Sequence, residues 1–179
     1  VSGVRLVSEL RQICASASTL RICSQLQDWK ILERTDPALS FDSNHFPDSQ
    51  LTTEYNLRTL LTGLLMYSPK KMRLAALERL QLPKPLRLFI EEACLLLHNV
   101  DGAKLTSESI TSYEKIGEES LAIASTLNKE KTTSIANALE KWARCSSHLT
   151  AADLKQIGIS TGSDIGLTLH RLKWADFIG

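Results

Sequence analysis

Apolar residues recur at helical spacing along most of the chain. The spacing i, i+3, i+4 is typical of amphipathic helices, and strands alternate with a period of two instead. Only the helical spacing is found, and it predicts helices over about 2–14, 17–31, 50–67, 69–81, 85–98, 106–127 and 131–145. The pattern therefore predicts an all-α fold.

Turn-forming residues separate these predicted helices. Ser2 can cap the first helix, Pro69 can occupy the first position of another, and Asp101-Gly102 is typical of a turn. The segment 41–49 lacks periodicity and predicts an exposed loop. No repeat of fixed period aligns along the chain, so we expect an irregular bundle of eight to nine helices, with residues 85–98 at its centre.

The most specific local motif is LTAADLKQIGISTGSDIGLTLHRL near the carboxyl terminus. Thr150 and Asp153 form the capping-box pattern [ST]xx[DE], Gly158 can end that short helix, and a last helix is expected from Ser163. Gly166 would allow the two helices to approach closely. The turn at Gly162 and Ser163 is either a helix N-terminus that binds phosphate through backbone N–H groups or simply a capped helical hairpin.

Composition places the chain among globular proteins. Its 179 residues are 43% apolar, which excludes a disordered tail, and 8 Gly with 5 Pro are too few for a loop-rich all-β domain. The four cysteines show no CxxC spacing, so we expect neither a zinc site nor a disulfide framework. The absence of a long apolar segment and of a signal-peptide pattern predicts no membrane association and a cytoplasmic, reducing location.

Charge is balanced overall but uneven along the chain. There are 21 Lys and Arg residues against 20 Asp and Glu residues, a net charge of +1. Residues 58–87 nevertheless hold seven bases against the single acid Glu78, and residues 101–140 hold four bases against seven acids. A nucleic acid could therefore lie along one side of the molecule although the chain is nearly neutral.

Lys70 and Lys71 sharpen this expectation. They fall in the first turn of a predicted helix, where the helix dipole disfavours cations by roughly 0.3–1 kcal/mol. Phosphate contact would explain two lysines at this place, and a solvated basic face is the alternative.

Residues for catalysis or metal binding are not brought together by any motif. The four histidines are scattered without metal-ligand spacing, and neither Asp-x-Asp nor a Gly-rich phosphate loop occurs. We therefore predict no catalytic residue and no metal site in this chain.

Both ends of the chain resemble one enzyme family. The carboxyl-terminal motif is similar to the end of bacterial-type (class II) tRNA nucleotidyltransferases and related poly(A) polymerases. The opening VSGVRLVSEL resembles the Val-Ser-x-Glu-Arg-Ile-x-x-Glu-Leu segment of the same family. Val4 replaces the usual Glu, and Thr161-Gly162-Ser163 replaces Pro-Gly-Pro. The family's catalytic head, with its Gly-Ser and Asp-x-Asp motifs, and its Glu-Asp-x-x-Arg motif have no counterpart here.

The resemblance implies that the chain is the helical neck, body and tail of such an enzyme, cut from a longer polypeptide. Residues 1–100 would be the distal neck and body, and 101–179 the tail. These parts would hold tRNA during tRNA processing while the head adds CCA, CC or A to its 3′ end. Mg²⁺, CTP and ATP are implied only for the head, and the chain alone should be inactive. Five basic residues would contact phosphates of the acceptor and T arms: Lys70, Lys71, Arg73, Arg79 and Lys84. The turn at Gly162 and Ser163 would approach the tRNA elbow.

A second hypothesis belongs to a different class of function. The chain would be a non-enzymatic helical module whose apolar grooves bind a protein partner. The basic segment would then be a solvated face, and a mixed α/β region upstream with Gly-Ser and Asp-x-Asp motifs would distinguish the hypotheses.

Overall fold

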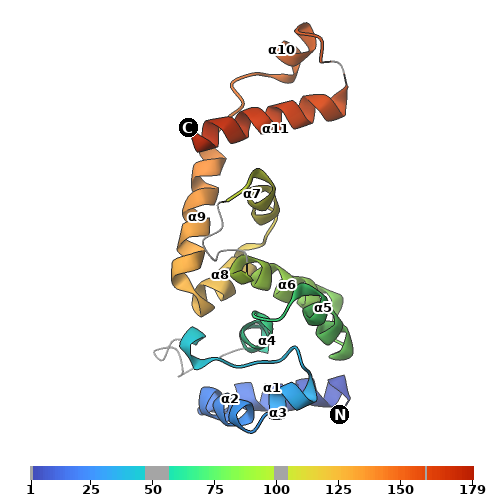
Figure 1. Ribbon diagram of the computed structural model, residues 1–179, viewed down its shortest axis with the longest axis vertical. Coiled ribbons are helices and arrows are strands. Elements are labelled where there is room, and N and C mark those ends of the chain that lie inside the picture. The colour runs from blue at the N-terminus through green and yellow to red at the C-terminus, as the bar shows by residue number, and fades with distance from the viewer. Residues whose placement is uncertain (1, 47–56, 99–104, 160) are drawn as a thin grey trace. The chain divides into compact units, whose positions relative to one another are not determined.

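The computed structural model describes residues 2–46, 57–98, 105–159 and 161–179 (Figure 1). Within these ranges the chain is helical and contains no strand, which confirms the all-α prediction. It has eleven α-helices there, slightly more than the eight to nine expected, and one short 3-10 helix, η1 (Ser43–His45). The α-helices are α1 (Gly3–Cys14), α2 (Thr19–Asp28), α3 (Ile31–Thr35), α4 (Leu57–Leu65), α5 (Lys70–Arg79), α6 (Lys84–His98), α7 (Ser107–Tyr113), α8 (Glu118–Leu127), α9 (Lys129–Arg144), α10 (Ala151–Gln156) and α11 (Gly162–Ile178).

The extra helices arise where predicted helices are interrupted. The helix expected over 17–31 ends at Asp28, because Lys30 adopts a left-handed conformation with φ 57°. The helix expected over 106–127 is two helices, α7 and α8, separated by residues 114–117. Residues 47–56 lie outside the described residues. They include the end of the loop expected over 41–49 and the start of the helix expected over 50–67.

The chain divides into two compact units. Residues 1–103 and 116–133 form unit 1, and residues 104–115 and 134–179 form unit 2. The division does not follow chain order, because residues 116–133, with helix α8, pack with the amino-terminal residues. The chain passes from unit 2 back to unit 1 within the break between α7 and α8.

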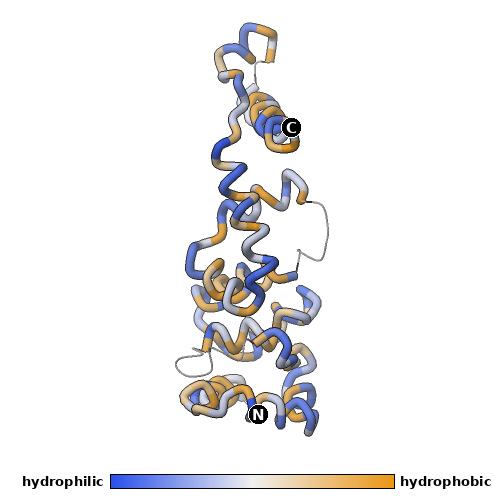
Figure 2. The backbone as a smooth tube through the Cα atoms, turned by 90° about the vertical axis from the view of Figure 1, so that its left-hand side faces the viewer, coloured by the Kyte–Doolittle hydropathy of each residue, from blue (hydrophilic) through white to orange (hydrophobic). Residues whose placement is uncertain are grey.

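Helix α4 is the centre of unit 1. All residues from Thr59 to Leu65 are buried, so this short helix is enclosed on every face. It contacts α1, α6 and α8 (Figure 1). Helix α6, expected at the centre, is instead amphipathic: Ile90 is fully buried whereas Leu88 is 54% exposed. Figure 2 shows this alternation of hydrophobic and hydrophilic positions along most helices.

Two glycines allow close packing in unit 1. A Cβ atom on Gly3 would lie 1.9 Å from the carbonyl oxygen of Arg79, so the start of α1 sits directly against the end of α5. A Cβ atom on Gly63 would lie 2.2 Å from the ring of Phe46. The Phe46 ring, stacked on that of Phe41, therefore packs directly on the backbone of α4.

Unit 2 is organised around aromatic residues. Ile110, Trp142 and Phe177 form its buried cluster, and Trp174 packs against them. Trp142 meets Phe177 edge-on, with 5.9 Å between ring centroids. Lys173 Nζ lies 4.2 Å from the centroid of the Trp142 ring, which adds a cation–π contact to this cluster.

Candidate nucleic-acid interface

Three of the seven bases in residues 58–87 are paired with acids in the structure. Arg58, Arg73 and Arg79 each form an ion pair with a carboxylate of unit 1. Arg58 pairs with Glu119 and also lies over the Phe89 ring, with 5.1 Å between its Cζ atom and the ring centroid. These pairs offset much of the positive charge that the sequence concentrates in this segment.

Arg73 does not lie on the exposed basic surface, and its prediction as a phosphate contact is wrong. The residue is 2% exposed, its Nε lies 2.7 Å from Glu91 Oε1, and its Nη1 donates to the Ser68 carbonyl oxygen at 2.9 Å. Burying a guanidinium requires such partners, because an unpaired buried charge is very costly. Its place in the interior is therefore structural.

Arg79 is more exposed than Arg73 but also forms an ion pair, with Asp36. Its Nε and Nη2 donate to the two carboxylate oxygens of Asp36 at 2.8 and 2.9 Å. Hydrogen bonding to this buried carboxylate raises the pKa of Arg79. Asp36 also accepts from the backbone N–H of Ala38, so Arg79 ties α5 to the turn after α3. It is a weaker candidate for phosphate contact than a lysine without a partner.

Lys70, Lys71 and Lys84 form the candidate interface, which we call the lysine surface. All three are exposed, and no carboxylate of the described residues forms an ion pair with them. Lys70 and Lys71 begin α5, and Lys84 begins α6. Neither helix has an acidic residue in its first turn. The lysines thus stand where two successive helix dipoles disfavour them.

The carboxyl-terminal hairpin of unit 2 follows the predicted capping pattern. Thr150 accepts from the N–H of Asp153 while the Asp153 carboxylate accepts from the N–H of Thr150, which confirms the capping box. Gly158 follows α10 with φ 95°, a conformation that suits glycine. The expectation that Gly166 permits close helix packing is wrong, because a Cβ atom there would meet nothing within 4 Å.

The N-terminus of α11 already has an acidic residue beside it. The helix begins at Gly162, one residue before the predicted start, and both Gly162 and Ser163 are exposed. Thr161 caps it by accepting from the N–H of Asp164 at 3.3 Å, and its hydroxyl donates to the Asp164 carboxylate. An incoming phosphate at Gly162 and Ser163 would meet this negative charge, so this turn is a less favourable anion site than the lysine surface.

Sequence reasoning missed a polar cluster that ties the segment before α10 to α11. His148 Nδ1 lies 3.4 Å from Ser146 Oγ, and its Nε2 lies 3.3 Å from Asp176 Oδ1. Asp176 also accepts from the backbone N–H of Ser146 at 3.0 Å, and this bond, followed by that to His148, lowers the pKa of Asp176. The His148 side chain is 76% exposed, so the cluster lacks the water-excluded setting of a nucleophilic site and serves as a surface tether.

The described ranges contain no group of three or more His, Cys, Asp or Glu side chains placed to hold a metal ion. No helix in the same ranges has the length and apolar character needed to cross a membrane.

Neither family models, curated proteins nor solved structures gave a match to this chain.

Proposed function

We propose that this chain binds the sugar-phosphate backbone of a folded RNA through the lysine surface of unit 1. The observation that supports this is the placement of Lys70, Lys71 and Lys84 in the first turns of α5 and α6, exposed and without ion pairs to described carboxylates. Folding gains nothing from cations at these positions, whereas phosphates gain from both the ammonium groups and the helix N–H groups beside them.

The RNA we propose is tRNA, as the resemblance to tRNA nucleotidyltransferases implies. A duplex of A-form geometry is recognised mainly through its shape and its phosphates, and lysines suit this because they act as point charges without base specificity. The chain would hold tRNA while a head domain outside it transfers nucleotides to the 3′ end. With tRNA, CTP, ATP and Mg²⁺, the chain alone should incorporate no nucleotide.

The test is titration of the chain with folded tRNA over a series of salt concentrations. We expect the logarithm of the affinity to fall with the logarithm of the salt concentration, by roughly 0.7–0.9 for each phosphate contact. The double variant Lys70→Glu with Lys71→Glu should bind more weakly and have a shallower slope, by roughly 1.4–1.8 if both lysines contact phosphates.

A matched control separates a local contact from a change in net charge. Lys115 and Lys129 are also exposed lysines, but they lie in the acidic part of the sequence. Lys115→Glu with Lys129→Glu changes the net charge equally and should leave the salt slope unchanged. Equal loss of affinity in both double variants, or none in either, would overturn the lysine surface as the interface.

A further inference from the structure

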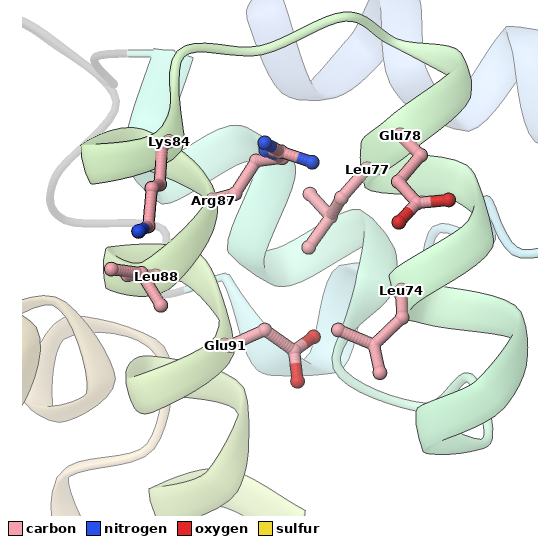
Figure 3. Close-up of a pocket in the computed structure, with 7 residues that line it drawn as sticks. All are labelled: Leu74, Leu77, Glu78, Lys84, Arg87, Leu88 and Glu91. Atoms are coloured by element: carbon pink, nitrogen blue, oxygen red, sulfur yellow. The ribbon is translucent and has the colours of Figure 1, made fainter.

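A pocket of about 220 Å³ opens between α5 and α6 in unit 1 (Figure 3). Its lining residues are Leu74, Leu77, Glu78, Lys84, Arg87, Leu88 and Glu91. Leu77 is buried, whereas Leu74 is 42% and Leu88 54% exposed. Two leucines from adjacent helices therefore face solvent at an opening whose interior is largely aliphatic.

The charges around the pocket leave hydrogen-bond donors in excess. Of the two carboxylates that line the pocket, Glu91 is already paired with Arg73, which leaves Glu78 against the two cations Lys84 and Arg87. Arg87 Nε is buried and has no hydrogen-bond partner among the residues that the structure describes. Figure 3 shows the Arg87 side chain extending from α6 towards α5 near Leu77, and Lys84 beside Leu88. The Arg87 guanidinium is thus incompletely hydrogen-bonded, and a ligand acceptor placed against its outer nitrogens would be favourable.

From these features we infer that the pocket binds a protein segment that presents a large apolar side chain with a carboxylate beside it. The apolar side chain would lie between Leu74, Leu77 and Leu88. The carboxylate would accept hydrogen bonds from Arg87 and Lys84. This inference goes beyond RNA binding, because it gives the chain a protein partner at a pocket beside the lysine surface, with Lys84 on the edge of both.

The lining favours a protein segment over a nucleotide. Bases that bind outside a helix usually stack on aromatic rings or on exposed guanidinium planes. No aromatic ring lines this pocket, and its one guanidinium, that of Arg87, is half-buried. Its volume lies below the roughly 300–1,000 Å³ of small-molecule sites and suits a single anchoring side chain.

The test uses the full chain with methyl-labelled leucines and a peptide probe observed by NMR. The probe is acetyl-Gly-Ser-Leu-Glu-Glu-Ser-Gly-amide. We expect saturable shifts of the Leu74 and Leu88 methyl signals and none at Leu167, a leucine on α11 that is similarly exposed at 50%. Peptides with Gln in place of both Glu residues, or with Ser in place of Leu, should bind about tenfold more weakly or worse.

Variants of the pocket test each part of the inference. Arg87→Gln and Leu88→Ser should each weaken binding of the peptide about tenfold or more, while Leu167→Ser should not change it. Circular dichroism checks that each variant is folded. Absence of saturable shifts at millimolar peptide, or equal binding of the Gln peptide, would overturn the proposal. Shifts at the two leucines with tRNA but not with peptide would overturn it in favour of an RNA site.

RNA binding by the lysine surface and peptide binding by the pocket can be tested independently. Lys70→Glu with Lys71→Glu should weaken tRNA binding and leave peptide binding unchanged, and Leu88→Ser should do the reverse. Lys84 borders both surfaces and is left unchanged in these tests.

Discussion

Arg73 of α5 and Glu91 of α6 form an ion pair within unit 1, with 2.7 Å between Arg73 Nε and Glu91 Oε1. The Arg73 side chain is 3% exposed and that of Glu91 18%. A further hydrogen bond from Arg73 Nη1 reaches the carbonyl oxygen of Ser68, just before α5. One arginine thus holds the start of α5 and the side of α6, which are the helices that present both the lysine surface and the pocket.

Arg73→Ala should therefore destabilise the chain severely. Removing one member of a buried ion pair leaves the other charge without a partner, which costs about 3–5 kcal/mol. Lys71→Ala, an exposed substitution two residues away, should change the free energy of unfolding by no more than about 0.5 kcal/mol. Urea unfolding followed by circular dichroism measures both. The double change Arg73→Met with Glu91→Leu should recover most of the lost stability, and a mild effect of Arg73→Ala alone would contradict the structural role.

Gly3→Ala should destabilise unit 1. An added Cβ atom would lie 1.9 Å from the Arg79 carbonyl oxygen and 2.8 Å from the Leu80 Cα atom, both of which are backbone. Backbone cannot rotate away as a side chain can, so α1 must shift from the end of α5. Overpacking of this kind costs about 1–3 kcal/mol. Thermal unfolding should show a lower midpoint, and an unchanged or higher midpoint would show that the two helices are not in this contact.

Gly166→Ala should have the opposite effect. Gly166 lies within α11, and a Cβ atom there would meet nothing within 4 Å. Alanine in a helix interior is more favourable than glycine by about 1 kcal/mol. Urea unfolding should therefore show a gain in the stability of unit 2. A loss of stability would mean that this face of α11 is closely packed, as the sequence had suggested.

Features that depend on neighbouring residues, such as helix caps, could be predicted from the sequence. The Thr150–Asp153 capping box and the Ser2 cap depend on residues three positions apart, and both are found in the structure. The break between α7 and α8 has no such signal except Gly117. It follows from the division into units, since Ile110 and Tyr113 of α7 are buried in unit 2, while Ile123 of α8 is buried in unit 1.

The candidate site was less predictable because its partners are distant in sequence. A count of charges along the sequence gives Lys71 and Arg73 the same weight as candidate phosphate contacts. In the structure Arg73 is neutralised by Glu91, 18 residues away, and Arg79 is paired with Asp36, 43 residues away. Helical periodicity gives no information about which acid on another helix meets a given base. The same limit hid the contact of His148 with Asp176, 28 residues apart.

The cysteine thiols should differ sharply in reactivity. Burial raises the pKa of Cys23 to about 12 and that of Cys94 to about 12, against an ordinary value of 9.0. The thiolate is the reactive form, so at pH 8 the shift alone should slow alkylation about a thousandfold relative to the unfolded chain. Cys14 and Cys145 are both partly exposed, but burial raises the pKa of Cys14 to about 11, so Cys145 should be labelled first. Mass spectrometry after iodoacetamide treatment, with and without urea, checks this order, and rapid labelling of Cys94 in the native chain would contradict its burial.

Asp153 should make the stability of the α10–α11 hairpin depend on acid pH. The backbone N–H and the hydroxyl of Thr150 donate to its carboxylate, each at 2.7 Å, and hold the pKa of Asp153 below its ordinary value of 3.8. The folded state thus favours the ionised form, and the unfolded state binds more protons near pH 4. Stability from this group is present above about pH 4 and is lost as the pH falls through the lowered pKa.

Asp153→Asn removes the ionisable group, so comparison with the unaltered chain shows in which direction Asp153 changes the stability with pH. At neutral pH the variant should unfold at a lower temperature than the unaltered chain, because the charged acceptor of the capping box is gone. The difference should shrink as the pH falls below about 4 and disappear once Asp153 is protonated in both states. Thermal unfolding of both proteins between neutral and strongly acidic pH measures this difference in unfolding temperature.

Glu108→Gln is the matched control. It removes the same charge from the first turn of α7, but the capping box there is completed by Ser109 and not by Glu108, so the change in unfolding temperature should be smaller. A gap that stays constant with pH for Asp153→Asn would mean that the Thr150 hydrogen bonds do not depend on the charge of Asp153.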